Sequence, residues 1–187
     1  MEIPRRLASL GHAVTGLYPM TLRDLLSALA EPALLGRGLG AWDSGHDALV
    51  AQRLLEDGGL PMASGLPRRP LARALARTLS DLRRQGVHPA HLDAVASRAG
   101  ADGQGTLAAV ARLYRDFHAA VDGRFADTAA LAAAAAGEAT RARWLQDAEV
   151  LIVGELEPSG TEKSFLAALA AARPVRVLAH DAAARVE

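Results

Sequence analysis

A run of apolar residues that ends in glutamates is the first place in this chain where side chains could do chemistry. Residues 150–154 are expected to form a buried strand that ends at Gly154, and Glu155 and Glu157 follow it. Adjacent acids at the end of such a strand can hold a magnesium ion and orient an attacking water. The first of the two positions is Gly154, which has no carboxylate, so Glu155 would be the remnant of a degenerate site. The alternative, which the lone acid favours, is that both glutamates are solvated residues before a helix.

A phosphate-binding loop is missing from the sequence. Such a loop has the form Gly-x-x-x-x-Gly-Lys-Ser/Thr, because backbone N–H groups must close around phosphates and a lysine must reach them. The only lysine is Lys163, which follows the acidic turn and no glycine-rich loop. We therefore expect no nucleotide hydrolysis by this chain alone, no catalytic residue and no cofactor.

Four arginines could instead bind a polyanion. Arg69, Arg73, Arg77 and Arg84 fall near one face of a predicted helix over 70–85. A row of arginines on one helix face can follow the phosphates of a DNA strand. The alternative is that the row is only the solvated face of an amphipathic helix.

Histidines and tryptophans give weaker signals. His88 and His91 have a spacing that can converge on a metal ion, but Pro89 separates them and the nearby acids are too few. We expect both histidines to be surface residues and predict no metal site. Trp42 is expected to pack against neighbours, and Trp144 to be a core or interface anchor rather than a platform for stacking bases.

Composition places few limits on the function. The 187 residues carry 21 basic and 21 acidic side chains, a net charge of zero, and no cysteine. No overall field would attract nucleic acid or a membrane surface, so any DNA contact must come from local clustering. No apolar run approaches the roughly 18 residues of a membrane span, and no signal peptide is evident. We expect a cytoplasmic protein without membrane contact.

The spacing of apolar residues predicts a mostly helical chain with three strands. Strands are expected over 13–18, 150–154 and 175–179. The expected helices cover 4–10, 22–30, 46–57, 70–85, 106–121, 126–136, 138–146 and 161–172, with a short one after Pro89. A Gly/Pro-rich linker over 57–70 is the clearest internal boundary.

Several stretches, in this order, resemble one helicase family. Residues 17–26 (LYPMTLRDLL) look like the strand and helix that follow its phosphate loop, and 71–87 (LARALARTLSDLRRQGV) look like the helix that opens its helical insertion. Residues 107–118 resemble the next helix, and 150–156 (VLIVGEL) resemble its second-motif strand. The family is that of AddB-type helicase–nuclease subunits, relatives of UvrD/Rep-like superfamily I helicases. The likeness covers about residues 5–180.

The resemblance implies an α/β fold that is mostly helical by residue count. A partial P-loop-NTPase-like parallel sheet would come from 1–43 and 147–187, with a large all-helical insertion over 44–146. The family's metal-binding aspartate would fall on Gly154 and its catalytic glutamate on Glu155, so the second motif would be degenerate. The resemblance also implies that this chain is an N-terminal-lobe fragment, with the phosphate loop and nuclease domain outside it.

For function, the resemblance implies DNA-end processing and recombinational repair. The chain would be catalytically silent on its own and would bind DNA, single-stranded or at ends, or scaffold a partner helicase–nuclease subunit. Whether it is part of an enzyme stays open, because the family is enzymatic but its motifs are missing or degenerate here. The alternative is a helical protein–protein interaction module with no nucleic-acid role, which the neutral charge and alanine-rich helices also fit.

Overall fold

The computed structural model describes residues 9–11, 16–42, 44–58, 60, 65–99 and 101–178. Most of these residues are helical, and the strands among them are short. The elements are, in chain order, α2 (Leu22–Gly36), β1 (Gly40–Ala41), α3 (Ser44–Gly58), α4 (Arg68–Arg84), α5 (Pro89–Arg98), α6 (Ala101–Val121), β2 (Phe125–Ala126), α7 (Thr128–Glu138), a 3₁₀ turn (Arg143–Leu145), β3 (Val150–Val153), α8 (Gly160–Ala172) and β4 (Val175–Leu178). In this part of the chain, no helix is both long and apolar enough to cross a lipid bilayer.

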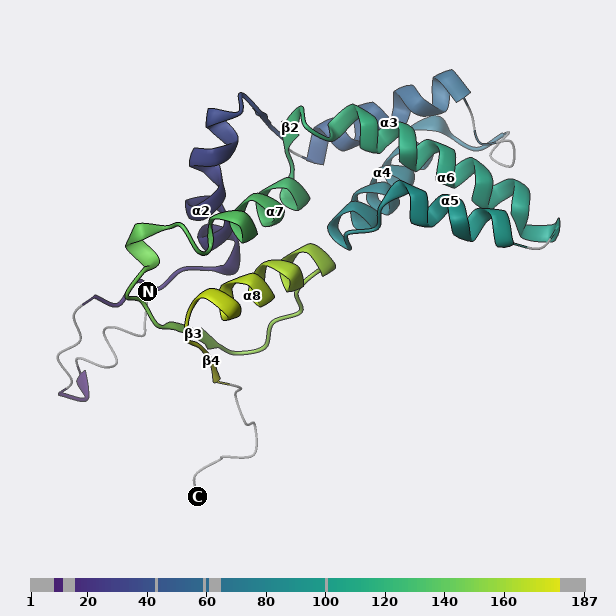
Figure 1. The fold of residues 1–187 in the computed structure, drawn as a ribbon. Coiled ribbons are helices and arrows are strands. Elements are labelled where there is room, and N and C mark those ends of the chain that lie inside the picture. Colours follow the sequence, from purple (N-terminus) through teal and green to yellow (C-terminus); the bar gives the residue numbers. More distant parts are fainter. Residues whose placement is uncertain are drawn as a thin grey trace.

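Two hydrophobic cores divide the elements into two lobes (Figure 1). The first lobe contains α2, α7, α8, β3 and β4, and its core is built around Leu26, Leu29 and Phe165. The second lobe contains α3, α4, α5 and α6, and its core is built around Leu79 and Phe117. Large apolar side chains fill each core, so each lobe has its own source of hydrophobic stabilisation.

The alanine-rich helix α7 lies in the first lobe, between α2 and α8. Its inward residues Ala132 and Ala135 are fully buried, and their small side chains let both neighbouring helices approach closely. The expected helical insertion ended at residue 146 and so included this helix. The packing shows that α7 belongs with α2 and α8, whereas the division of the chain into domains stays a prediction.

The strand–helix–strand unit at the end of the described chain is confirmed. Strands β3 and β4 pair in parallel, with Val150 opposite Val175 and Val153 opposite Leu178. Helix α8 connects them and buries Phe165 and Leu169 in the first core. The carboxylate of Glu162 accepts hydrogen bonds from the backbone N–H and hydroxyl of Ser159, both at 2.7 Å, which fixes the start of α8.

The third expected strand, over 13–18, is not found. Residues 13–15 lie outside the described residues, and 16–18 form a bend and irregular backbone. Gly16 has a positive φ of 76°, which an extended strand does not allow, and Pro19 follows closely. The described sheet around β3 therefore has two strands, and a P-loop-like sheet is not confirmed.

Other expected boundaries also shift. Helix α2 continues to Gly36 through Pro32, because Leu29 and Leu34 on either side of the proline are buried in the first core. The helix expected over 138–146 is wrong: the chain turns after Glu138 and makes only a 3₁₀ turn. The expected helix over 4–10 lies almost wholly outside the described residues. A two-residue parallel pairing of β1 with β2 was not expected at all.

Helix α2 starts where the sequence predicts. The Thr21 hydroxyl accepts a hydrogen bond from the Asp24 backbone N–H at 3.1 Å, and the Asp24 carboxylate accepts one from the Thr21 backbone N–H at 3.1 Å. This reciprocal pair satisfies two backbone donors that the first helical turn would otherwise leave free.

Candidate nucleic-acid interface

Helix α4 presents two different sides. Leu75 and Leu79, together with the small residues Ala72 and Ala76, recur at three and four positions and are buried in the second lobe. Pro70 lies in the first turn, where its missing N–H breaks no helical hydrogen bond. The burial of the leucine side fixes the rotation of the helix, so the opposite side is open to solvent.

The four predicted arginines lie on the open side. Arg69, Arg73 and Arg77 are exposed and four residues apart, so they follow one another along about 12 Å of helix. Within the described ranges these three make no ion pair. Arg84 is also exposed, and its guanidinium is 3.9 Å from the carboxylate of Asp81. The structure therefore brings all four together on one helix, with Arg84 partly neutralised.

Helix α4 concentrates positive charge in a neutral chain. It carries six arginines and one aspartate, a net charge of +5, although the whole chain has a net charge of zero. The remainder of the chain is therefore net acidic. Arg83 is paired with two aspartates, so the local field comes from the exposed arginines of α4 and attracts polyanions over about a Debye length.

Arg83 differs from these arginines, and the sequence reasoning missed it. Only 6% of its side chain is exposed, and its Nε donates to Asp127 Oδ2 at 2.6 Å. Its Nη2 donates to Asp122 Oδ1 at 3.3 Å. Arg83 lies four residues after Leu79, on the buried period of α4, so the helical spacing alone could have separated it from the exposed row.

The surroundings of Arg83 shift three pKa values. Burial works to lower the pKa of Arg83, but the hydrogen bond and charge of Asp127 outweigh it and raise that pKa. Burial raises the pKa of Tyr114, whose hydroxyl donates to the carbonyl oxygen of Val87. Burial, and then the charge of Arg83, lower the pKa of His118. Arg83 therefore stays charged and is held in place by ion pairs with Asp122 and Asp127.

The end of α4 also contacts the first lobe directly. The Gly160 backbone N–H donates to the side-chain Oε1 of Gln85 at 3.0 Å, and the Thr161 hydroxyl donates to the Arg84 carbonyl at 2.9 Å. A Cβ on Gly160 would lie 2.2 Å from the carbonyl oxygen of Gln85, so only glycine fits there. Together with the Arg83–Asp127 pair, these contacts form the junction between the two lobes.

The backbone of the turn after β3 favours the glycine that the sequence has at position 154. Gly154 has a positive φ of 96°, a backbone conformation that an aspartate adopts only with strain. Glu155 and Glu157 are exposed, as the solvated alternative expects. The turn after β3 thus has the carboxylate of Glu155 but a backbone shape at position 154 that does not favour a second one there.

The two histidines of the weak metal-like pair are surface residues, as predicted. His88 and His91 are exposed, and the ring of His88 lies 5.9 Å from that of His118, centre to centre. His88 also caps α5, because its Nδ1 accepts the backbone N–H of Ala90 at 3.3 Å. Among described residues, no three His, Asp or Glu side chains are placed to hold a metal ion.

The tryptophans differ from each other. The indole N–H of Trp42 donates to Asp47 Oδ1 at 2.6 Å, and the ring packs on Phe125 at 4.6 Å, so the predicted packing role is confirmed. Trp144 is 53% exposed and is not a core residue. Whether it anchors an interface stays a prediction.

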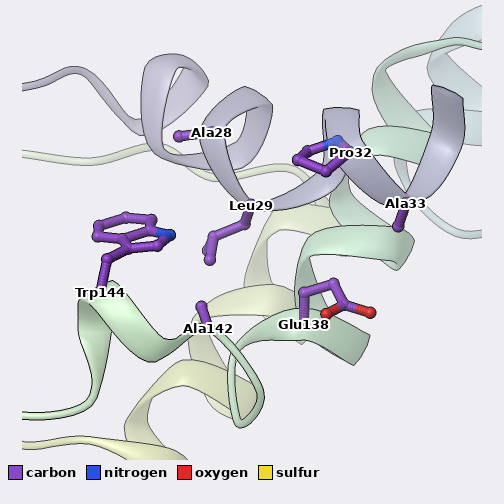
Figure 2. Close-up of a pocket in the computed structure, with 7 residues that line it drawn as sticks. All are labelled: Ala28, Leu29, Pro32, Ala33, Glu138, Ala142 and Trp144. Atoms are coloured by element: carbon purple, nitrogen blue, oxygen red, sulfur yellow. The ribbon is translucent and has the colours of Figure 1, made fainter. Parts of the chain in front are cut away.

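Trp144 borders an open groove of about 350 Å³ (Figure 2). Helix α2 forms one wall, and the segment from Glu138 to Trp144 forms the other. The lining is mostly apolar, and Pro32 removes the helical N–H that would bond the carbonyl of Ala28. The groove brings no catalytic set of side chains together.

Comparison with protein-family models and with curated proteins gives no match for this chain.

Proposed function

We propose that this chain is a nucleic-acid-binding module, catalytically silent on its own, that binds single-stranded DNA or DNA ends through the exposed arginines of α4. In this proposal it takes part in DNA-end processing and recombinational repair, next to a partner helicase–nuclease subunit. A cytoplasmic location is part of the same proposal. The observation that supports it most is the row Arg69, Arg73 and Arg77, exposed on one side of a helix with a net charge of +5.

The degenerate second motif supports the silent part of the proposal. A nucleotide-hydrolysing site needs a metal-binding acid and a water-orienting acid next to bound phosphates. Gly154 supplies no acid, and its positive φ disfavours one. Any contribution to a motor would therefore come through DNA or partner binding.

The test is the binding of a fluorescently labelled single strand, measured by anisotropy at 50 mM and 200 mM salt. Arg73→Ala/Arg77→Ala removes two phosphate contacts and should weaken binding about tenfold at the lower salt concentration. The slope of the log of the binding constant against the log of the salt concentration should become shallower by about 1.4. The matched control is Arg53→Ala/Arg98→Ala, which removes two exposed arginines from α3 and α5. Equal binding by both double variants would remove the α4 row from the proposal.

The second candidate is a protein–protein interaction module with no nucleic-acid role. The exposed apolar residues of β3 and β4 favour it, because such residues usually lie beneath a partner. If wild type fails to bind DNA at 50 mM salt, the second candidate replaces the first.

A further inference from the structure

The two-stranded sheet of β3 and β4 is uncovered on one side. Parallel sheets normally have both faces buried, because the helices that connect their strands pack on the faces. Helix α8 lies against one face, where Val150 and Val175 pack on the first core. On the other face Leu151 is 49% exposed, Val153 59% and Leu178 53%.

Within the part of the chain that the structure describes, one edge of this sheet also has no neighbouring strand. The backbone N–H of Val150 donates to the carbonyl oxygen of Pro174, just before β4, and that of Gly154 donates to the carbonyl oxygen of Leu178 at the end of β4. Because N–H groups alternate between the two edges of a strand, those of Leu151 and Val153 point away from β4. No described strand pairs with that edge of β3. Such an edge is a ready template for one more strand.

Acidic residues lie at both ends of this edge. Asp147 and Glu149 precede β3, Glu155 and Glu157 follow it, and all four are exposed. Arg176 on β4 pairs with Glu149 and leaves the other three without a described ion-pair partner. A second copy of this chain would bring the same acids against these acids in either strand direction, and like charges in close pairs are destabilising.

We propose that the outer edge of β3 is a docking site for an extended segment of a protein partner, in which alternating apolar residues are flanked by basic ones. The segment adds a strand beside Leu151 and Val153, its apolar side chains cover the exposed face, and its basic ends pair with the acids. This surface is separate from the arginine row of α4, so the inference does not depend on DNA binding.

The test uses two synthetic peptides with the same alternating Val–Thr core, one with Arg-Lys at each end and one with Glu-Glu. Binding is measured by fluorescence anisotropy, and the site is located by amide NMR shifts and hydrogen exchange. The basic peptide should bind at least about tenfold tighter and slow the exchange of the Leu151 and Val153 amides. Glu155→Lys/Glu157→Lys leaves Asp147 and Glu149 in place, so it should abolish the preference for the basic peptide.

Two proline variants separate docking from folding. Val153→Pro removes an N–H that points to the free edge, so β3 should still pair with β4 while peptide binding weakens about tenfold. Ile152→Pro removes an N–H that points to β4, and should disrupt the sheet itself. The amide spectrum of Val153→Pro shows whether the rest of the fold is intact, and Glu155→Lys/Glu157→Lys tests the site without any proline.

Four outcomes would overturn the proposal. The first two are equal binding of the two peptides, and unchanged peptide binding by Val153→Pro with an intact spectrum. The third is self-association of the wild type through β3, which would make a second copy the occupant. The fourth is slow exchange of the Leu151 and Val153 amides in the free protein, which would make the occupant a segment of this chain.

Discussion

Arg83 and Arg84 are neighbours on α4 but have opposite environments. Arg83 is 6% exposed and bonds to carboxylates of Asp122 and Asp127, whereas Arg84 is 51% exposed and has one distant partner, Asp81. The difference comes from a single step of 100° around the helix, which takes the side chain from the junction between lobes to solvent. The arginines of α4 therefore form two groups, one that holds the lobes together and one that is available to a ligand.

The largest expected effect is on stability, from Arg83→Ala. Removing one partner of a buried ion pair leaves Asp127 uncompensated, at a cost of about 3 kcal/mol in the free energy of unfolding. Arg84→Ala should change it by less than about 0.5 kcal/mol. Urea unfolding followed by circular dichroism measures both. Similar losses for the two variants would show that the distinction is wrong.

The next largest effect tests the close approach of Gly160 on α8 to Gln85 at the end of α4. Gly160→Ala places a methyl group against the backbone of Gln85, so the end of α4 must move away from α8. We expect a loss of about 2 kcal/mol in the free energy of unfolding. Gly137→Ala on α7 is the control, since its new methyl group would meet nothing within 4 Å and alanine favours a helix. Destabilisation by Gly137→Ala but not by Gly160→Ala would contradict the close approach.

A smaller effect tests whether the exposed arginines of α4 bind phosphates by charge alone. Arg73→Lys/Arg77→Lys keeps both positive charges but removes the two-pronged donors of arginine. If the row only neutralises phosphates, the affinity for single-stranded DNA should stay within about threefold of wild type, with the same salt slope. The anisotropy titration that tests the alanine variants measures this. A loss as large as that of the alanine pair would indicate directed hydrogen bonds instead.

The smallest effect is a pH dependence from His118. Its lowered pKa means that the unfolded chain takes up the histidine proton at a higher pH than the folded chain. The free energy of unfolding should therefore fall as pH drops from above the ordinary value of 6.5 through the lowered pKa. Asp122, Asp127, His88 and Arg83 are the charged groups that act on it.

The measurement is urea unfolding at pH 8 and pH 5.5 for wild type, His118→Gln and His91→Gln. His118→Gln should reduce the pH difference, whereas exposed His91→Gln should leave it. If the difference is the same in all three proteins, His118 does not titrate as proposed.

Local patterns predicted most of the helices and the unit β3–α8–β4. Leu75 and Leu79 on α4, and Tyr114 and Phe117 on α6, repeat with a helical period that burial confirms. The parallel pairing of β3 with β4 follows from an intervening helix, which a parallel connection needs. The positions of the four exposed arginines also followed from the period of α4.

Features that depend on distant contacts were not predicted. The pairing of Gly40–Ala41 with Phe125–Ala126 spans the whole second lobe, and two residues carry no strand pattern. Helix α2 passes Pro32 because tertiary burial offsets the lost hydrogen bond, which propensity cannot show. The partner of Arg83 is 44 residues away, so the sequence could have marked the arginine as buried without naming Asp127.

Asp127 couples the two halves of the protein. One oxygen of its carboxylate accepts the Ala130 backbone N–H at 2.8 Å and so begins α7, while the other accepts Arg83 of α4. If the first turn of α7 unwinds, Arg83 in the other half loses its carboxylate partner. If α4 moves away, Asp127 at the start of α7 loses the arginine that neutralises it. Because the two halves share this carboxylate group and the contacts of Gly160 and Thr161, we expect calorimetry to record a single transition in which neither half persists alone.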